Sequence, residues 1–369
     1  MNRESNNFLK SAANVKYVMR EIFVNRTDGY YQNLRVASDM IDNELTVSHM
    51  LRSQNGFTKS GLAYGAMLAE KLALPPDPRI LEVGPGLGDL AANFCAALGS
   101  EAGFSYTFCD ISFDVIKHLR SRFRDRRFSF AFGDFLDEKT MFTRFGYEGR
   151  FDLIICNEVV ADMPTIVNMT LDRPRIREGD ADAYYDAVSL AKFYGLALTR
   201  ASNFSYGALK FLIRAKALLA EGGKIFVCEH SSPKSPKPQK PGRVGVFGHS
   251  EYAVDFAMLE QAAHKMKFRN IERGRMTDLL GIREDRKAVI FFTQPELKML
   301  YNFLRKRGIS LDQRAYEPVE VIALLEKNGV SVQKRGAYAA FLESRARPLR
   351  EITDQFSYLL LESNHVEED

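Results

Sequence analysis

One segment constrains the fold of this chain more than any other. Residues 79–90 read RILEVGPGLGDL, an apolar run followed by glycines at alternating positions, Gly84, Gly86 and Gly88. The apolar run predicts a buried strand, and the residues after the glycines predict a helix that begins at once. Glycine in such a turn permits unusual backbone angles and lets a ligand lie against the main chain. The segment therefore predicts an α/β sheet with a site for an extended polar cofactor at the carboxyl end of this strand.

The spacing of the glycines discriminates between cofactors. A dinucleotide fingerprint, G-x-G-x-x-G, needs its third glycine at position 89, where this chain has Asp89. A pyrophosphate at this helix N-terminus would also meet the carboxylates of Glu82 and Asp89. A cofactor with cationic groups and no phosphate fits better, and S-adenosylmethionine (SAM) carries an ammonium and a sulfonium. We therefore expect SAM, with Glu82 beside its methionine end, and the pattern disfavours an NAD(P) oxidoreductase.

Two later strands end in residues that suit the remainder of SAM. Asp110 ends the second predicted strand, where a carboxylate can accept both ribose hydroxyls. Asp134 and Phe135 follow the third, and offer an acceptor for the adenine amino group and an aromatic face for the ring. Each aspartate is also a common turn or helix cap when taken alone. Their order after the glycine turn supports the cofactor interpretation.

The fourth predicted strand ends in Asn157 and Glu158, and Asp162 follows shortly before Pro164. In open α/β sheets, ligands bind outside the carboxyl ends of the strands. We expect Asn157 to contact the cofactor, and Glu158 and Asp162 to act as catalytic residues facing the methyl acceptor. The alternative is that these polar residues cap the next helix.

Apolar runs alternate with amphipathic segments from residue 79 onward, which is typical of a mostly parallel sheet. We expect a helical N-terminal segment over residues 1–75 and a cofactor-binding domain over 76–369. Residues 165–220 are too many for a simple crossover and predict an inserted helical region, whereas 232–243, with four prolines and four basic residues, predict a solvated loop. The predicted strands are 80–83, 105–109, 128–132, 151–156, 224–229 and 356–361, and later helices are predicted at 295–307 and 318–328.

Composition excludes several classes of protein. With 51 basic and 47 acidic residues the formal charge is +4, and 46% of residues are hydrophobic, which excludes a disordered or fibrous chain. An apolar N-terminal signal and an 18-residue apolar run are both missing, so we expect a cytoplasmic protein. The four cysteines show no C-x-x-C spacing and the six histidines no H-x-x-x-H pair, so we expect reduced cysteines and no metal site.

The motifs from Glu82 to Gly88, with Asp110 and Asp134, resemble those of class I SAM-dependent methyltransferases. More narrowly, the chain resembles the MidA-type family, which includes the mitochondrial complex I assembly factor that methylates a protein arginine. In that family the fourth strand leads into N-E-x-x-D-A-x-P. Here Ala161 precedes Asp162, so the second acid is displaced by one residue, which in a helix rotates its side chain by about 100°. The other segments that carry the narrower resemblance are residues 17–31, with a helix before Gly29-Tyr30-Tyr31, residues 56–58 leading into 65–72, and residues 254–256.

The resemblance implies a Rossmann-like, seven-stranded sheet that is mostly parallel and has an antiparallel last hairpin. It also implies that the N-terminal helices and the 165–220 insertion form a lid over the carboxyl ends of the strands. The implied activity is SAM-dependent transfer of a methyl group to a protein side chain, arginine included, or to a small metabolite. We expect no membrane partner and no nucleic acid.

Two alternatives stay open at this point. An RNA methyltransferase is suggested by Arg120, Arg122, Arg124, Arg126 and Arg127, although Asp125 and the low net charge favour a solvated helix face. A non-catalytic assembly or scaffolding protein with the same fold is the other alternative, but such a protein would not need three alternating glycines.

Overall fold

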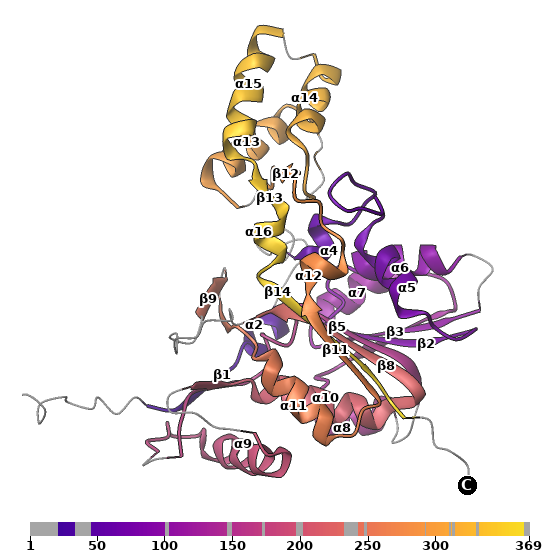
Figure 1. Cartoon of the computed structure of the whole chain (residues 1–369), viewed down its shortest axis with the longest axis vertical. Coiled ribbons are helices and arrows are strands. Elements are labelled where there is room, and N and C mark those ends of the chain that lie inside the picture. Colours follow the sequence, from indigo (N-terminus) through magenta and orange to yellow (C-terminus); the bar gives the residue numbers. More distant parts are fainter. Residues whose placement is uncertain are drawn as a thin grey trace, which may run out of the picture.

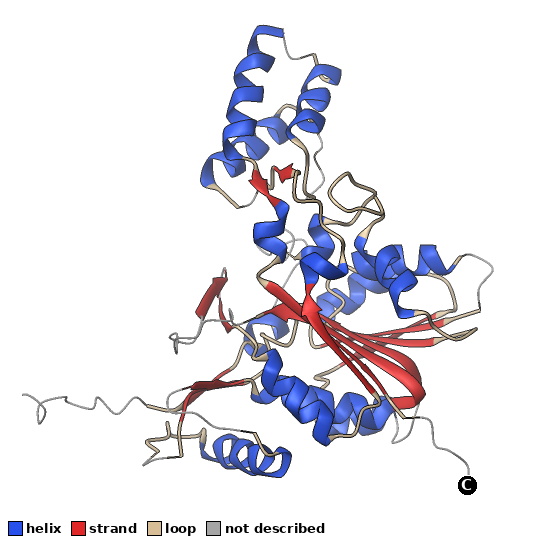
Figure 2. Ribbon diagram, viewed as in Figure 1, coloured by secondary structure: helices blue, strands red, loops and turns tan. Residues whose placement is uncertain are grey.

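The computed structural model describes residues 21–33, 46–99, 103–145, 150–171, 174–196, 202–231, 243–246, 249–291, 293–309, 311, 314–329 and 332–364. Its centre is a seven-stranded sheet in the order β11-β14-β8-β5-β2-β3-β4, with helices on both faces (Figure 1; Figure 2). The strands are β2 (Arg79–Val83), β3 (Ser105–Asp110), β4 (Phe128–Phe132), β5 (Phe151–Asn157), β8 (Leu219–His230), β11 (Asn270–Arg275) and β14 (Phe356–Glu362).

Six of these strands point the same way, and β14, between β8 and β11, runs antiparallel to both. The predicted Rossmann-like sheet with an antiparallel last hairpin is therefore confirmed. Within this seven-stranded sheet, β11 is the strand that the sequence pattern did not predict. It lies at the sheet edge and reads NIERGR, with no fully buried residue, so it lacks the apolar run that marks a central strand.

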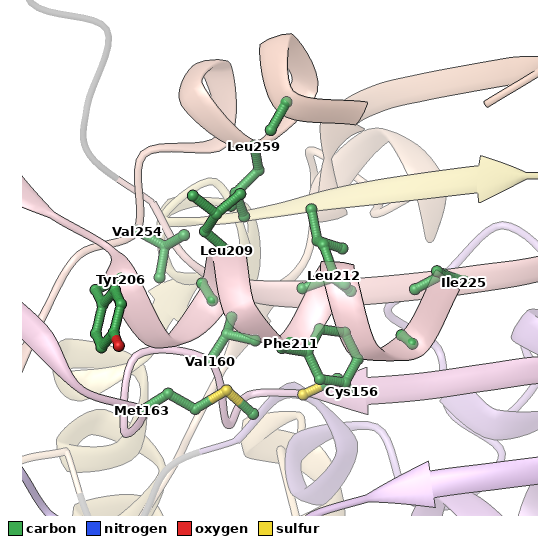
Figure 3. Packing of buried hydrophobic residues seen from close by; sticks show 14 of the residues in the cluster. Cys156, Val160, Met163, Tyr206, Leu209, Phe211, Leu212, Ile225, Val254 and Leu259 are labelled. Atoms are coloured by element: carbon green, nitrogen blue, oxygen red, sulfur yellow. The ribbon is translucent and has the colours of Figure 1, made fainter. Parts of the chain in front are cut away.

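The sheet carries a hydrophobic cluster on each face, because alternate strand residues point to opposite sides. Ile80 of β2 belongs to the cluster under α5 (Tyr64–Leu72), α6 (Asp89–Leu98) and α7 (Phe113–Arg122). The next residue, Leu81, belongs to the cluster under α10 (Tyr206–Leu218) and α11 (Phe256–Lys265). Figure 3 shows this second cluster, in which side chains of α10 lie between the end of β5 and α11.

The N-terminal segment is joined to the 165–220 region by a small antiparallel sheet. In it β1 (Phe23–Asn25) pairs with β6 (Thr165–Met169), which pairs with β7 (Ser202–Phe204). The helix expected before Gly29 is therefore wrong for residues 23–25, where the chain is extended because it pairs with a strand far away in sequence. Residues 1–20 of that expectation lie outside the described residues.

Beside this small sheet, the described part of the N-terminal segment contains three short helices, and a longer helix lies between β6 and β7. They are α2 (Asp28–Gln32), α4 (Val47–Met50), α5 and α9 (Ala181–Tyr194). The 165–220 region is therefore a mixture of β6, α9, β7 and α10, and α10 leads directly into β8. Another helix, α8 (Glu138–Phe145), follows β4.

A helical unit after α12 (Met276–Leu279) stands away from the sheet (Figure 1). It consists of α13 (Pro295–Lys306), α14 (Pro318–Lys327) and α15 (Val332–Arg345), which enclose a third hydrophobic cluster of their own. The chain enters and leaves it through the pair β12 (Lys287–Ala288) and β13 (Arg347–Pro348), and α16 (Leu349–Thr353) then leads to β14. The two helices predicted at 295–307 and 318–328 are found in this unit.

Two further expectations concern the loop and the cysteines. Residues 232–242 lie outside the described residues, and Arg243 begins β9 (Arg243–Val246), which forms a hairpin with β10 (His249–Tyr252). The four cysteines are free, and three of them are buried in strands of the sheet. Among the described residues, none of the helices combines the length and the apolar character that crossing a membrane requires.

Candidate functional site

A cavity of about 460 Å³ lies at the carboxyl ends of β2, β3, β4 and β5. This volume is in the range of small-molecule sites. Residues of α2 and α4 and the first residues of α10 also line it, so the N-terminal segment covers the strand ends. The predicted site residues that line the cavity are Glu82, Gly84, Gly86, Asp110, Asp134, Phe135, Asn157, Glu158 and Asp162.

The three glycines of the turn have different roles, although all have a positive φ. A Cβ on Gly86 would meet no protein atom within 4 Å, so the missing side chain leaves space inside the cavity. A Cβ on Gly84 would lie 2.4 Å from the Val159 side chain, and one on Gly88 would lie 2.6 Å from the Phe123 ring. Gly88 therefore permits packing against α7 and does not line the cavity, contrary to its predicted contact with the cofactor.

Glu82 is a buried carboxyl at the end of β2. Its Oε2 accepts a hydrogen bond from the Tyr106 hydroxyl on β3 at 2.9 Å. Burial raises the pKa of Glu82 to about 8, against the effect of this hydrogen bond. A buried carboxyl of this kind is stabilised in its ionised form by a cation, so Glu82 suits the ammonium of a methionine group.

Asp110 and Asp134 end the next two strands and line the same cavity. One oxygen of each is used locally, since Asp110 Oδ1 accepts the N–H of Ser112 and Asp134 Oδ1 accepts that of Leu136, both at 2.7 Å. Burial raises the pKa of Asp134. Phe135 packs against Phe211 with ring centroids 5.3 Å apart, so its ring is largely committed to the core. Apolar cover at this end also comes from Ile111 and Leu136, which sequence analysis did not identify.

Glu158 is held from several directions where β5 ends. Its carboxylate accepts the backbone N–H of Val47 at 2.9 and 3.0 Å and the Asn157 side-chain amide at 3.0 Å. Its own N–H donates to Cys228 O on β8 at 2.7 Å. The backbone is left-handed, with φ of 57°, which costs roughly 1–2 kcal/mol for a non-glycine residue. These bonds retain that conformation, and burial raises the pKa of Glu158 to about 8.

The alternative that the polar residues after β5 cap the next helix is not found for Glu158. Glu158 caps α4, which precedes it by more than a hundred residues, rather than a helix that follows it. Asp162 lies one turn further along, and its carbonyl oxygen accepts the Thr27 hydroxyl at 2.5 Å. Its displacement in the sequence therefore still leaves Asp162 at the wall of the cavity, beside the N-terminal segment.

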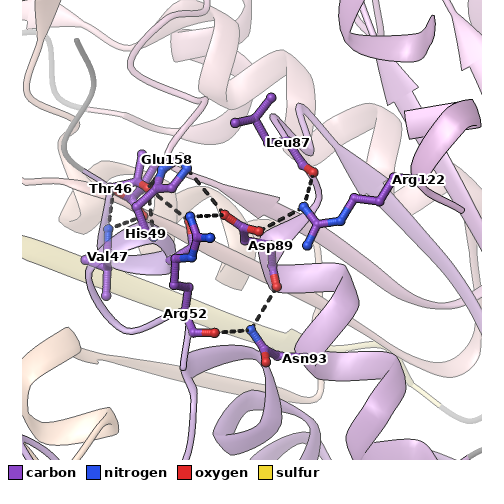
Figure 4. Close-up of polar contacts among 10 residues, drawn as sticks. Thr46, Val47, His49, Arg52, Leu87, Asp89, Asn93, Arg122 and Glu158 are labelled. Atoms are coloured by element: carbon purple, nitrogen blue, oxygen red, sulfur yellow. Dashed lines mark hydrogen bonds and ion pairs between the residues drawn. The ribbon is translucent and has the colours of Figure 1, made fainter. Parts of the chain in front are cut away.

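A polar cluster around Asp89 borders the cavity (Figure 4). Asp89 Oδ1 lies 2.8 Å from Arg122, and its Oδ2 lies 3.4 Å from His49 Nε2 and 3.6 Å from Arg52. His49 Nδ1 is 2.8 Å from the Thr46 hydroxyl, and burial lowers the pKa of His49, so the ring is neutral at neutral pH. His49 and Thr46 were not predicted as site residues, because nothing in their local pattern marks them as cavity residues.

The arginine run does not form one continuous face. Arg122 bonds to Asp89 and to Leu87 O, whereas Arg120 lies over the Phe130 ring and Arg127 over that of Phe104. Arg127 also bonds to Asp125. Arg124 also donates to Ser121 O at 3.1 Å. Four of the five arginines thus make contacts within the protein, which weakens the interpretation of the run as a phosphate-binding surface.

One part of the chain is similar to a known family. Residues 81–190 match the family model described as "Methyltransferase domain". No curated protein matches the chain significantly.

Similar solved structures include phosphoethanolamine N-methyltransferase 2 of Haemonchus contortus with S-adenosylhomocysteine, at 14% identity and a TM-score of 0.40, covering 98% of this chain and 74% of that one. The 1,6-didemethyltoxoflavin-N1-methyltransferase of Burkholderia thailandensis matches at 16% identity and a TM-score of 0.34, covering 59% and 72%. The [4+2]-cyclase SpnF matches at 12% identity and a TM-score of 0.40, covering 81% of each chain. These similarities are too low to transfer a substrate.

Residues 81–190 thus contain a methyltransferase domain, and the cofactor of such a domain is SAM. The residues of the cavity fit this cofactor. Gly86 leaves open space beside the main chain, Glu82 offers a carboxyl to a cationic group, and Asp110 and Asp134 follow in the order that ribose and adenine require.

Proposed function

We propose that this methyltransferase acts on a nitrogen atom of a cationic acceptor, and that the acceptor is the guanidinium of a protein arginine. A small basic metabolite is the second candidate. The observation that carries the proposal is the concentration of carboxyl groups beyond the end of β5. Glu158 and Asp162 line the cavity there, and Glu251 is near enough to raise the pKa of both Glu158 and Glu229.

The order of the strands supports placing the acceptor at this end. The turn after β2 and the ends of β3 and β4 suit methionine, ribose and adenine in succession, and β5 lies on the other side of β2. Groups after β5 thus face what lies beyond the methionine end, which is where the acceptor must approach. A cationic nitrogen there would relieve the repulsion among the buried carboxyl groups.

Methyl transfer is an in-line displacement that depends mainly on alignment and on exclusion of water. SAM, when bound, supplies a methyl group on a cationic sulfur that leaves as a neutral thioether. The chain supplies the rest. A cationic acceptor stabilises the ionised form of Glu158, whose pKa burial raises to about 8. The carboxylate, held by Val47 and Asn157, then accepts an N–H of the acceptor and orients the nitrogen. The proton displaced from that nitrogen moves to a Glu158 oxygen.

The N-terminal segment and the start of α10 cover the strand ends, which favours a narrow entrance for the acceptor. Thr27, Asp28 and Tyr31 line the cavity from the N-terminal side, and Tyr206 and Lys210 from α10. Tyr206 donates to Asp186 at 2.5 Å, and Arg26 pairs with Asp180 at 2.7 Å, so this cover is fixed by bonds to α9 and its N-cap. An arginine side chain is long enough to reach past such a cover from a protein surface. The resemblance to MidA-type enzymes favours the same acceptor.

The test is methyl transfer from radiolabelled SAM into a cell extract, followed by separation into protein, RNA and small-molecule fractions. We expect label in the protein fraction, recovered as methylarginine after acid hydrolysis, and about a hundredfold less with Glu158→Gln. Label confined to small molecules would favour the metabolite, and ribonuclease-sensitive label would overturn the proposal. SAM binding without transfer to any fraction would favour the scaffolding alternative.

A further inference from the structure

We infer that Tyr64 is a positioning residue for methyl transfer, acting through the side chain of Asn157 on the carboxylate of Glu158. The inference rests on the proposed function, which makes Glu158 the acceptor-facing group. Tyr64 does not line the cavity, so any effect of its hydroxyl on the reaction must pass through other residues.

Two hydrogen bonds connect α5 to the Glu158 carboxylate. The Tyr64 hydroxyl lies 2.6 Å from Asn157 Oδ1, and Asn157 Nδ2 lies 3.0 Å from Glu158 Oε1. Tyr64 is 1% exposed and Asn157 is 8% exposed, so water has little access to either. A buried chain of this kind fixes side-chain orientation, because each unmade bond would leave a polar group without a partner.

The direction of this chain follows from the amide. Asn157 has one acceptor end and one donor end. Because Glu158 Oε1 already accepts from Val47 N–H, the amide presents its NH₂ group to that oxygen and its carbonyl to Tyr64. The tyrosine hydroxyl is therefore the donor. Without it, the Asn157 amide can turn over, which would place its oxygen against the Glu158 oxygen.

Tyr64 also fixes α4 from the other end. Its backbone N–H donates to Leu51 O at 2.8 Å, directly after α4, while Glu158 holds the first residue of α4, Val47. Removing only the hydroxyl leaves this backbone bond intact. The Tyr64→Phe change thus removes the hydroxyl's bond to Asn157 together with its contact to the Cys228 thiol, and it retains the aromatic ring in the core.

The first experiment measures steady-state kinetics and SAM affinity of Tyr64→Phe. We expect kcat to fall about 10- to 100-fold, because small displacements of an aligning group have large kinetic effects, while the Kd for SAM changes less than about threefold. Tyr358→Phe is the matched control, since its hydroxyl donates to Glu272 at 2.6 Å on β11, outside the cavity. Its kcat should stay within about twofold.

A double-mutant cycle separates positioning from a general loss of packing. With Asn157→Ala as background, Tyr64→Phe should cause less than about a twofold further change in kcat, because the two residues act as one chain. Fully additive losses in kcat would overturn the inference.

An acceptor-independent readout is the titration of Glu158, followed by carbon-13 NMR of labelled glutamate carboxyls and assigned with Glu158→Gln. The ionisable groups that act on Glu158 or its neighbour Tyr64 are Glu251, Cys228 and Glu82. Glu158 should titrate near pH 8 in the wild type and at higher pH in both Tyr64→Phe and Asn157→Ala, but not in Tyr358→Phe. An unchanged titration in both variants overturns the inference, whether or not a methyl acceptor has been found. If the Glu158 titration shifts in both variants but no methyl acceptor is found, the positioning chain is supported and only the proposed function is contradicted.

Discussion

The Glu158 carboxylate accepts the backbone N–H of Val47 at 2.9 Å through one oxygen and 3.0 Å through the other. The two residues are 111 positions apart, so the bond joins the end of a central strand to the first turn of α4 in the N-terminal segment. It couples the acceptor side of the cavity to the segment that covers it. His49 also lies on α4, which this bond holds beside the cavity, and it lines the cavity wall.

Replacement of Glu158 by glutamine should separate SAM binding from turnover. The glutamine carbonyl can still accept from Val47, so α4 should stay in place, but the charge and the proton acceptor are lost. We expect a SAM Kd within about threefold of the wild type and a kcat lowered about a hundredfold. Calorimetry and radiolabel transfer measure the two quantities. A proportional loss in both would identify Glu158 as a cofactor ligand.

Valine at Gly86 should abolish SAM binding without unfolding the protein. The new side chain would enter open space in the cavity, where no protein atom lies within 4 Å of its Cβ. Gly195→Val is the matched control, because Gly195 also has a left-handed φ and an open Cβ position but does not line the cavity. We expect SAM affinity to fall at least about a hundredfold at Gly86 only, with similar small losses in Tm at both positions. Equal SAM affinity in the two variants would mean that the turn is not the cofactor site.

Stability should fall as pH rises, because two buried carboxyls keep their protons in the folded state. The pKa of Glu82 and of Glu158 is raised from 4.5 to about 8. Between these values the unfolded chain has lost protons that the folded chain retains, so the free energy of unfolding decreases with pH, by about 1.4 kcal/mol per pH unit per group. Below pH 4.5 this loss is absent, and above pH 8 it is complete.

Urea unfolding of Glu82→Gln at several pH values checks this sign. Relative to the wild type, the variant should become more stable as pH increases from 5 to 8, because glutamine releases no proton on unfolding. Curves for the two proteins that stay parallel over this range would contradict a raised pKa at Glu82.

SAM affinity should depend on pH through the same carboxyl. A cationic ligand binds ionised Glu82 best, so below its pKa of about 8 binding must expel a proton. The Kd for SAM should therefore decrease from pH 6 to pH 7.5, and this dependence should weaken in Glu82→Gln. Calorimetry in buffers of different ionisation enthalpy would detect the released proton. An equal pH dependence in variant and wild type would assign the effect to another group.

The arginine run offers a test of the RNA alternative. Arg124 and Arg126 are exposed, whereas Arg122 is engaged with Asp89. Changing both exposed arginines to alanine should leave kcat within about twofold and should not alter retention of RNA on filters. A marked loss of RNA binding would restore the alternative that the internal contacts of this run disfavour.

Local patterns were sufficient to predict much of the fold and site. The runs in β2, β3, β5, β8 and β14 are apolar because both faces of the sheet are covered there. The parallel order of the strands brings Asp110, Asp134 and Glu158 to one edge. Local sequence patterns failed to predict a strand where its pairing partner lies far away in the sequence. Phe23–Asn25 is extended because β6 pairs with it, and β11 joins the sheet through β14 although its sequence is polar.

Local sequence was enough to predict six strands of the sheet, the glycine turn and the polar residues at the strand ends, because each of these is marked by residues that follow one another in the chain. The tertiary structure set the role of each residue. It placed Gly88 against Phe123, brought His49 to the cavity wall, and made Glu158 the partner of Val47. The physical reason is that burial, hydrogen-bond partners and pKa are properties of three-dimensional neighbours, and those neighbours come from segments that the linear pattern does not connect.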